Sequence, residues 1–98
     1  MEFARMTSPL SSGSGGGLTP AYQESVITTP FSSGLGIPLG NVPDSQAAII
    51  VNYNGQVIRP DVDWELVGLS AVTLLFGDDP TNYDPAQCVV GINYWYSA

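Results

Sequence analysis

Apolar and polar residues alternate with a period of two in residues 61–66, and large apolar residues occupy every second position of residues 49–53 and 88–96. Successive side chains of a β-strand point to opposite faces, so this alternation is typical of strands with one buried face. Residues 71–76 are continuously apolar, which predicts a central strand covered on both faces. No segment shows a convincing helical period of 3.6 residues.

The clearest turn signal is Asn54-Gly55, which follows the first of these strands. Asn-Gly between β-forming residues favours a type I′ hairpin, because both central residues of that turn need a positive φ. Residues 77–86 read as a polar loop rich in turn-forming residues. The pattern therefore predicts an all-β fold, a small antiparallel sandwich or barrel of five to seven strands.

The first 43 residues have a different texture, rich in Gly, Ser, Pro and Thr. Residues 21–30 could form an edge strand, while residues 31–43 have apolar positions too widely spaced for a core of their own. We therefore expect an extended arm over 1–43 and a β-module over 44–98, with the arm lying across neighbouring subunits. The arm residues expected to contact a partner are Phe3, Leu18, Tyr22, Phe31, Leu35, Ile37 and Leu39.

The aromatic run Tyr94-Trp95-Tyr96 near the end of the chain presents a second candidate contact. Adjacent strand residues alternate faces, so at least one large aromatic side chain points away from the core of the module. A sandwich could bury all three, or Trp95 could lie in an intersubunit contact or stack on a glycan. We assign Trp95 to partner binding and leave these readings open.

The number of core-forming residues in 44–98 is small for an independently stable domain. The single cysteine, Cys88, excludes an internal disulfide, and the absence of histidine excludes a His-based zinc site. Oligomerisation is the remaining support, so we expect a homo-oligomer. Cys88 lies in an apolar strand, where it is expected to act as a small buried hydrophobe in a reducing compartment.

The net charge of −7, with two arginines and no lysine, argues against binding to nucleic acids or to anionic membranes. The acidic surface favours solubility or docking on a basic partner. Neither a signal peptide nor an apolar span long enough for a membrane is visible in the sequence. We therefore expect synthesis and assembly in a cytoplasm.

Candidate catalytic and metal-binding groups are few. With neither histidine nor lysine, the serines and Cys88 lack a base beside them in sequence, so we expect no enzymatic activity and no cofactor. Asp61, Asp63 and Glu65 share one strand face and are expected to be solvated there. The acids of the loop 78–84 do not follow the spacing of a calcium loop, and we expect no metal site.

The order of the hairpin, the Pro60-x-x-Asp63-Trp64 turn and the aromatic last strand resembles a small β-module of tailed-bacteriophage virion proteins. The resemblance covers about half of the chain. It implies a non-enzymatic structural protein of the virion that decorates or cements the capsid, with a trimer as the expected oligomer and the major capsid protein as a candidate partner. The alternatives are a short head or tail fibre, a collar or tail adhesin subunit, and a carbohydrate-binding module.

Overall fold

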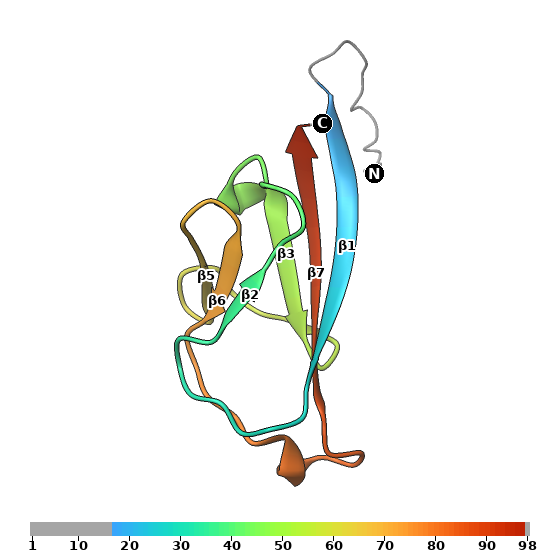
Figure 1. Ribbon diagram of the computed structural model, residues 1–98, viewed down its shortest axis with the longest axis vertical. Helices are drawn as coiled ribbons and strands as arrows, with labels where there is room; N and C mark the ends of the chain where they lie inside the picture. Colours follow the sequence, from blue (N-terminus) through green and yellow to red (C-terminus); the bar gives the residue numbers. More distant parts are fainter. Residues whose placement is uncertain (1–16, 98) are drawn as a thin grey trace.

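The computed structural model describes residues 17–97, which form two antiparallel β-sheets packed face to face (Figure 1). The described part contains seven strands and two short 3-10 turns, η1 (Gln46–Ala48) and η2 (Pro80–Asn82). The predicted all-β sandwich of five to seven strands is confirmed. Residues 1–16 of the chain lie outside the described part.

The larger sheet has four strands in the order β1-β7-β3-β4. The ten-residue strand β7 (Cys88–Ser97) lies at its centre and pairs along its whole length with β1 (Leu18–Ile27). On its other side β7 pairs with β3 (Ile49–Tyr53), which continues into the short β4 (Gln56–Val57). The edges of this sheet are therefore β1 and β4.

The hairpin between β3 and β4 turns at Asn54 and Gly55, with φ angles of 49° and 88°. Positive φ at both positions is what a type I′ turn requires, and the predicted hairpin is confirmed. The Asn54 side chain also accepts a hydrogen bond from the Val89 N–H at 2.8 Å, and the Asn54 N–H donates to the Val89 carbonyl at 2.8 Å. These two bonds fasten the turn to β7.

The smaller sheet has three strands in the order β2-β6-β5, with β2 at Gly36–Pro38, β5 at Trp64–Val67 and β6 at Ala71–Leu74. The expected central position of residues 71–76 is confirmed for β6. Its expected cover on both faces is wrong, because only Val72 and Leu74 are buried while Ala71 and Thr73 are partly exposed. No further layer of the described chain covers that side.

The core lies between the two sheets and draws from both of them. Side chains from β3 and β7 meet those of β2, β5 and β6, and the buried apolar set is Ile37, Leu39, Ile49, Val51, Trp64, Val72, Leu74, Val90, Ile92 and Tyr94. Trp64 and Tyr94 are the largest of these fully buried side chains. Burial of this apolar surface is the main favourable term that holds the two sheets together.

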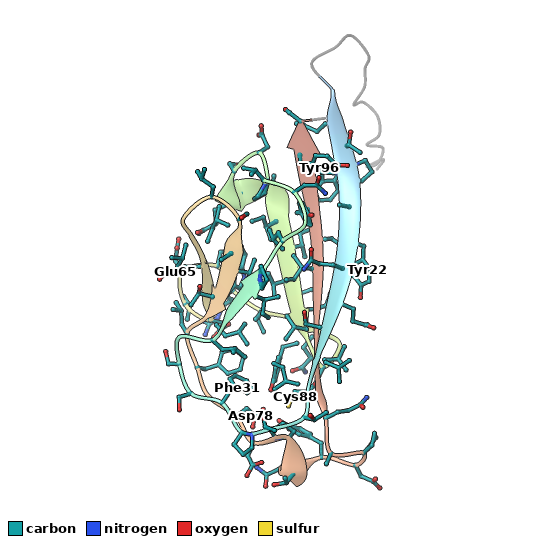
Figure 2. All side chains as sticks on the ribbon, in the orientation of Figure 1. Tyr22, Phe31, Glu65, Asp78, Cys88 and Tyr96 are labelled. Carbon is teal, nitrogen blue, oxygen red and sulfur yellow. The ribbon has the colours of Figure 1, made fainter. Side chains whose placement is uncertain are left out.

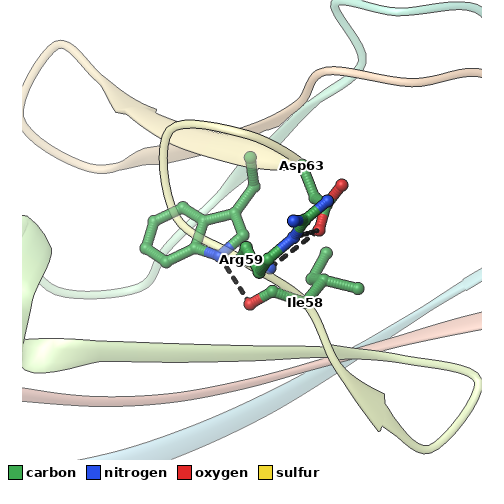
Figure 3. Close-up of polar contacts among 4 residues, drawn as sticks. Ile58, Arg59 and Asp63 are labelled. Carbon is green, nitrogen blue, oxygen red and sulfur yellow. Dashed lines mark hydrogen bonds and ion pairs between the residues drawn. The ribbon is translucent and has the colours of Figure 1, made fainter.

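The Pro-x-x-Asp-Trp segment forms the turn that delivers Trp64 into this core (Figure 3). Asp63 accepts hydrogen bonds from Arg59, at 2.9 Å from its main-chain N–H and 3.4 Å from Nε. The Trp64 indole N–H donates to the Ile58 carbonyl at 3.3 Å, so its one polar atom is satisfied while the ring is buried. The carboxylate and the indole of this motif therefore have structural roles here.

Residues 18–39 do not form an arm separate from the module, contrary to the expected boundary between residues 43 and 44. They supply one edge strand to each sheet, β1 and β2, and the Gln23 side chain joins the two strands. The alternation of exposed and half-buried residues along β1 allows its inner face to pack while its outer face stays in solvent. The apolar residues from 31 to 39 fill this chain's own core instead of a neighbour's.

Candidate functional site: the outer face of the four-stranded sheet

The face of the four-stranded sheet that points away from the core carries a group of exposed apolar side chains, which we call the outer face. Residues directly opposite in an antiparallel pair point to the same side of a sheet. The pairs Pro20–Trp95, Val26–Val89, Ile50–Asn93 and Asn52–Val57 therefore bring side chains of all four strands together. The exposed large apolar members of the outer face are Leu18, Tyr22, Val26, Ile50, Val57 and Trp95.

These side chains are exposed to a degree that is uncommon for apolar residues. Val57 is 71% exposed, Tyr22 56% and Trp95 36%. Single exposed apolar residues are ordinary, but a contiguous group of them on one sheet face marks an interaction surface. The described part places six of them on one face, which makes this surface the candidate functional site.

The outer face is also nearly free of charge. Glu24 is the only Asp, Glu, Lys or Arg residue on the four strands of this sheet, although the whole chain has a net charge of −7. The other described acids lie in the smaller sheet and in loops, and they are Asp44, Asp61, Asp63, Glu65, Asp78, Asp79 and Asp84. The charge distribution therefore separates an apolar surface from an acidic remainder.

Gly91 sits at the centre of the outer face and lets two polar side chains close over β7. A Cβ built on Gly91 would lie 2.8 Å from the Tyr22 hydroxyl and 2.7 Å from Asn52 Oδ1. The Tyr22 ring therefore leans from β1 over β7, and its hydroxyl also donates to Glu24 at 3.2 Å. The labelled Tyr22 can be followed in Figure 2 beside β1.

The structure divides the residues predicted to bind a partner into three groups. Leu18, Tyr22 and Trp95 lie on the outer face. Ile37 and Leu39 are 6% and 8% exposed, so the expectation that they contact a partner is wrong for this fold. Their burial follows from strand β2, which pairs with β6 and directs Ile37 into the core.

The remaining predicted contacts, Phe31 and Leu35, are half-buried against the core, and Phe3 lies outside the described residues. Sequence reasoning missed Val26, Ile50 and Val57 as members of the outer face. The period of two shows which residues of a strand share a face. It does not show which of the two faces of the sheet stays exposed to solvent, so these three residues could not be recognised from the sequence.

Phe31 belongs to an aromatic group at one end of the sandwich, together with Tyr53 and Phe76. The three rings meet edge to face, with centroid distances of 5.0 to 6.3 Å. Mutual hydrogen bonds between Phe31 and Asp78, at 2.9 and 3.0 Å, join the two loops that carry them. Figure 2 shows Phe31, Asp78 and Cys88 close together at the lower end of the molecule.

Asp78 is the carboxylate with the most hydrogen bonds at this end of the sandwich. Its Oδ2 accepts hydrogen bonds from the hydroxyls of Tyr83 at 2.7 Å and Tyr53 at 2.8 Å, and its Oδ1 accepts from the Asp79 N–H at 2.8 Å. The bonds from Tyr83, Tyr53 and Asp79 lower the pKa of Asp78 below its usual 3.8. Burial, followed by hydrogen bonding, raises the pKa of Tyr53.

From these hydrogen bonds we expect the ionised form of Asp78 to contribute to the stability of the fold. Because the folded-state pKa of Asp78 is lowered, its contribution is present above about pH 3.8 and is lost as the pH falls through the folded pKa. The Asp78→Asn variant should therefore be less stable at neutral pH and should lose less stability between neutral and acidic pH. Denaturation midpoints measured by circular dichroism from pH 7 down to pH 2 would show the difference.

Asp44→Asn is the matched control, because the Asp44 side chain makes no hydrogen bond to the described residues. It should follow the wild-type pH profile. Equal acid sensitivity of the wild type and Asp78→Asn would show that the carboxylate of Asp78 does not contribute in its ionised form.

Neither a cluster of metal-binding side chains nor a helix able to cross a membrane is found between residues 17 and 97. The described Cys, Asp and Glu residues form no group of three that could hold a metal ion. Asp79 accepts hydrogen bonds from the Thr81 N–H and hydroxyl, and so caps η2 from within the loop weighed above for calcium. No helix of this part has the length and apolar character needed to cross a bilayer.

Comparison with protein-family models, with curated proteins and with solved structures gives no match. The class that fold and site define is thus a small β-sandwich with one exposed, nearly uncharged apolar sheet face.

Proposed function

We propose that this protein is a non-enzymatic structural subunit of a bacteriophage virion, which decorates or cements the capsid through the outer face of its four-stranded sheet. The single observation that carries the docking role is the outer face itself, six exposed apolar side chains on a surface with one acid. The virion setting comes from the resemblance of the hairpin, the Pro60–Trp64 turn and β7 to phage structural modules.

The chemistry of the outer face favours a protein partner with an apolar surface. Trp95 and Tyr22 supply rigid aromatic area, and such residues contribute a large share of binding energy in protein interfaces. The surrounding acids lie outside the face and would remain in solvent at the rim of a contact. Repetition on a symmetric shell would let many modest contacts add up to stable attachment.

We assign the proposed attachment surface to the module and not to the arm. Residues 31–39 are committed to this chain's own core and to its loops, so they no longer supply partner contacts. The outer face combines residues of β1, β3, β4 and β7, and it forms only when the sheet is assembled. Attachment should therefore depend on the folded module.

Co-sedimentation with purified phage particles and with tail-less heads tests this proposal. The wild-type protein should bind both, and Trp95→Ala should weaken binding by at least about tenfold, because a large aromatic anchor is lost. Leu69→Ala is the matched control, since Leu69 is 74% exposed in the turn between β5 and β6. That variant should bind like the wild type.

Binding to complete particles but not to tail-less heads would move the protein to a fibre, a collar or the tail. Binding to neither, together with retention of specific sugars on a glycan array, would favour a carbohydrate-binding module that stacks sugars on Trp95. Equal loss of binding in both variants would contradict docking through the outer face.

A further inference from the structure

Among residues 17–97, no strand pairs with the outer edge of the ten-residue strand β1. β1 pairs with β7 on one side, from Leu18–Ser97 to Ile27–Cys88, and no other strand of the described residues pairs with its other side. Figure 1 shows β1 at the margin of the sheet. A long edge strand presents unpaired N–H and C=O groups, which are a template for pairing with another chain.

The hydrogen bonds of β7 determine which residues of β1 point to this edge. The Val89 carbonyl accepts from Asn54, which lies beyond the end of β3, so odd-numbered residues of β7 direct their main-chain groups away from β1. The even-numbered residues, from Cys88 to Tyr96, therefore bond to β1. Through the observed register their partners are Thr19, Ala21, Gln23, Ser25 and Ile27.

The residues between these partners direct their main-chain groups to the open edge. They are Leu18, Pro20, Tyr22, Glu24 and Val26, the same residues whose side chains point outward. Pro20 lacks an N–H group. Because its main chain faces the open edge, this absence removes no hydrogen bond to β7. The Tyr22 ring leans over Gly91 of β7 and not over the edge, so it leaves the main chain accessible.

We propose that this edge pairs with the same edge of a second copy, antiparallel about a two-fold axis at Tyr22, to form one continuous eight-stranded sheet. In this register Tyr22 faces Tyr22 of the second copy, and Leu18 faces Val26. Pro20 then faces Glu24, so that no two like charges are opposed. A register centred on Glu24 would place two carboxylates opposite each other, which is unfavourable.

The charge distribution along β1 does not oppose a second copy at this edge. Two chains of net charge −7 repel one another, and β1 carries Glu24 alone among its ten residues. The acids gathered in the smaller sheet and in the loops would remain outside the joint. Opposite residues share a face, so the outer faces of the two copies would form one wider apolar surface.

The lengths of the other edge strands favour this two-fold pairing over the expected trimer. A cyclic trimer joined by strand pairing needs β1 to pair with a different edge of its neighbour, because its interfaces are heterologous. The other edge strands are β4, β2 and β5, with two, three and four residues. Among these edges, only β1 of a second copy has the ten residues needed to pair with the whole of β1.

Proline substitution at neighbouring positions tests the edge. Glu24→Pro removes an N–H that points to the open edge, and also removes a charge, so lost self-association could not be due to charge repulsion. Ser25→Pro removes an N–H that bonds to β7. We expect a wild-type dimer in the micromolar range, a Glu24→Pro monomer that melts within a few degrees of the wild type, and a Ser25→Pro variant that melts at least about 10 °C lower.

Disulfide trapping tests the register. The Cα atoms of a hydrogen-bonded antiparallel pair lie about 5.5 Å apart, within the span of a disulfide. Under mild oxidation Tyr22→Cys should therefore form a covalent dimer. Val57→Cys, on the far edge strand β4, should not, and the native Cys88 is buried in both.

Sedimentation equilibrium and non-reducing electrophoresis provide the measurements, and neither uses phage particles, so the outcome is independent of the proposed function. A wild-type monomer would show that Pro20 and Glu24 protect the edge, and a trimer or a dimeric Glu24→Pro variant would place the interface elsewhere. Each of these results overturns the proposal. A dimer that Tyr22→Cys fails to trap overturns the two-fold at Tyr22.

Discussion

Replacing Trp64 by alanine is expected to destabilise the protein by about 3–5 kcal/mol, the usual range for removing a large buried aromatic side chain. Trp64 is 1% exposed and packs in the core between the two sheets, and its indole N–H bonds to Ile58. Because the free energy of unfolding of a small domain is about 5–15 kcal/mol, this loss would leave a large part of the population close to unfolding.

Trp95→Ala is the matched control for this prediction. Trp95 is 36% exposed on the outer face, so its removal should change stability by about 1 kcal/mol or less. Urea unfolding followed by circular dichroism measures both variants without relying on tryptophan fluorescence. Similar midpoints for the two variants would contradict the assignment of one tryptophan to the core and the other to the surface.

The second large effect is expected from truncation. Deleting residues 1–30 removes β1, which pairs with all ten residues of β7. It also removes Gln23, whose side chain donates to the Pro38 carbonyl at 2.8 Å and accepts from the Gly40 N–H at 3.1 Å. The central strand would become an edge with one side of its main chain unpaired, so we expect loss of cooperative unfolding.

Deleting only residues 1–16 is the control, because every strand of the described part begins at Leu18 or later. This shorter truncation should retain the far-ultraviolet spectrum and a cooperative melt. Its binding to particles also separates the two regions, because an attachment surface on the outer face predicts binding close to that of the full chain. A stable, cooperative protein lacking residues 1–30 would show that β1 is not needed to complete the sheet.

The local pattern of residues was sufficient to predict the class of fold and its sharpest turn. Asn54-Gly55 predicts its own conformation, because few other residue pairs adopt a positive φ twice in succession at low cost. The period-two spacing of residues 87–96 likewise predicts a strand with Cys88, Val90, Ile92, Tyr94 and Tyr96 on one face, and the first four of these are buried while Tyr96 is half-buried. These properties depend on neighbours in sequence.

The candidate site was only partly predictable. Tyr22 and Trp95 stand out as aromatic residues with an uncertain burial, and both lie on the outer face. Val57 gives no such signal, because its exposure follows from the end of a two-residue strand at the far edge of the sheet. Conversely, Ile37 lies among Gly and Pro residues that suggest an uncovered segment, and yet its pairing with Val72 takes it into the core.

The pattern of residues alone was enough for the all-β character and for the hairpin, because these follow from backbone preferences and the alternation of side chains. It was not enough for every inward face, because Val62 is 54% exposed in the turn that precedes β5. Only the tertiary structure decided that residues 18–27 join the sheet beside β7, some seventy positions along the chain. Local sequence predicted an edge strand over residues 21–30, but the choice of β7 as its partner depends on the whole assembled core and leaves no local signal. The same long-range pairing creates both the outer face and its open edge.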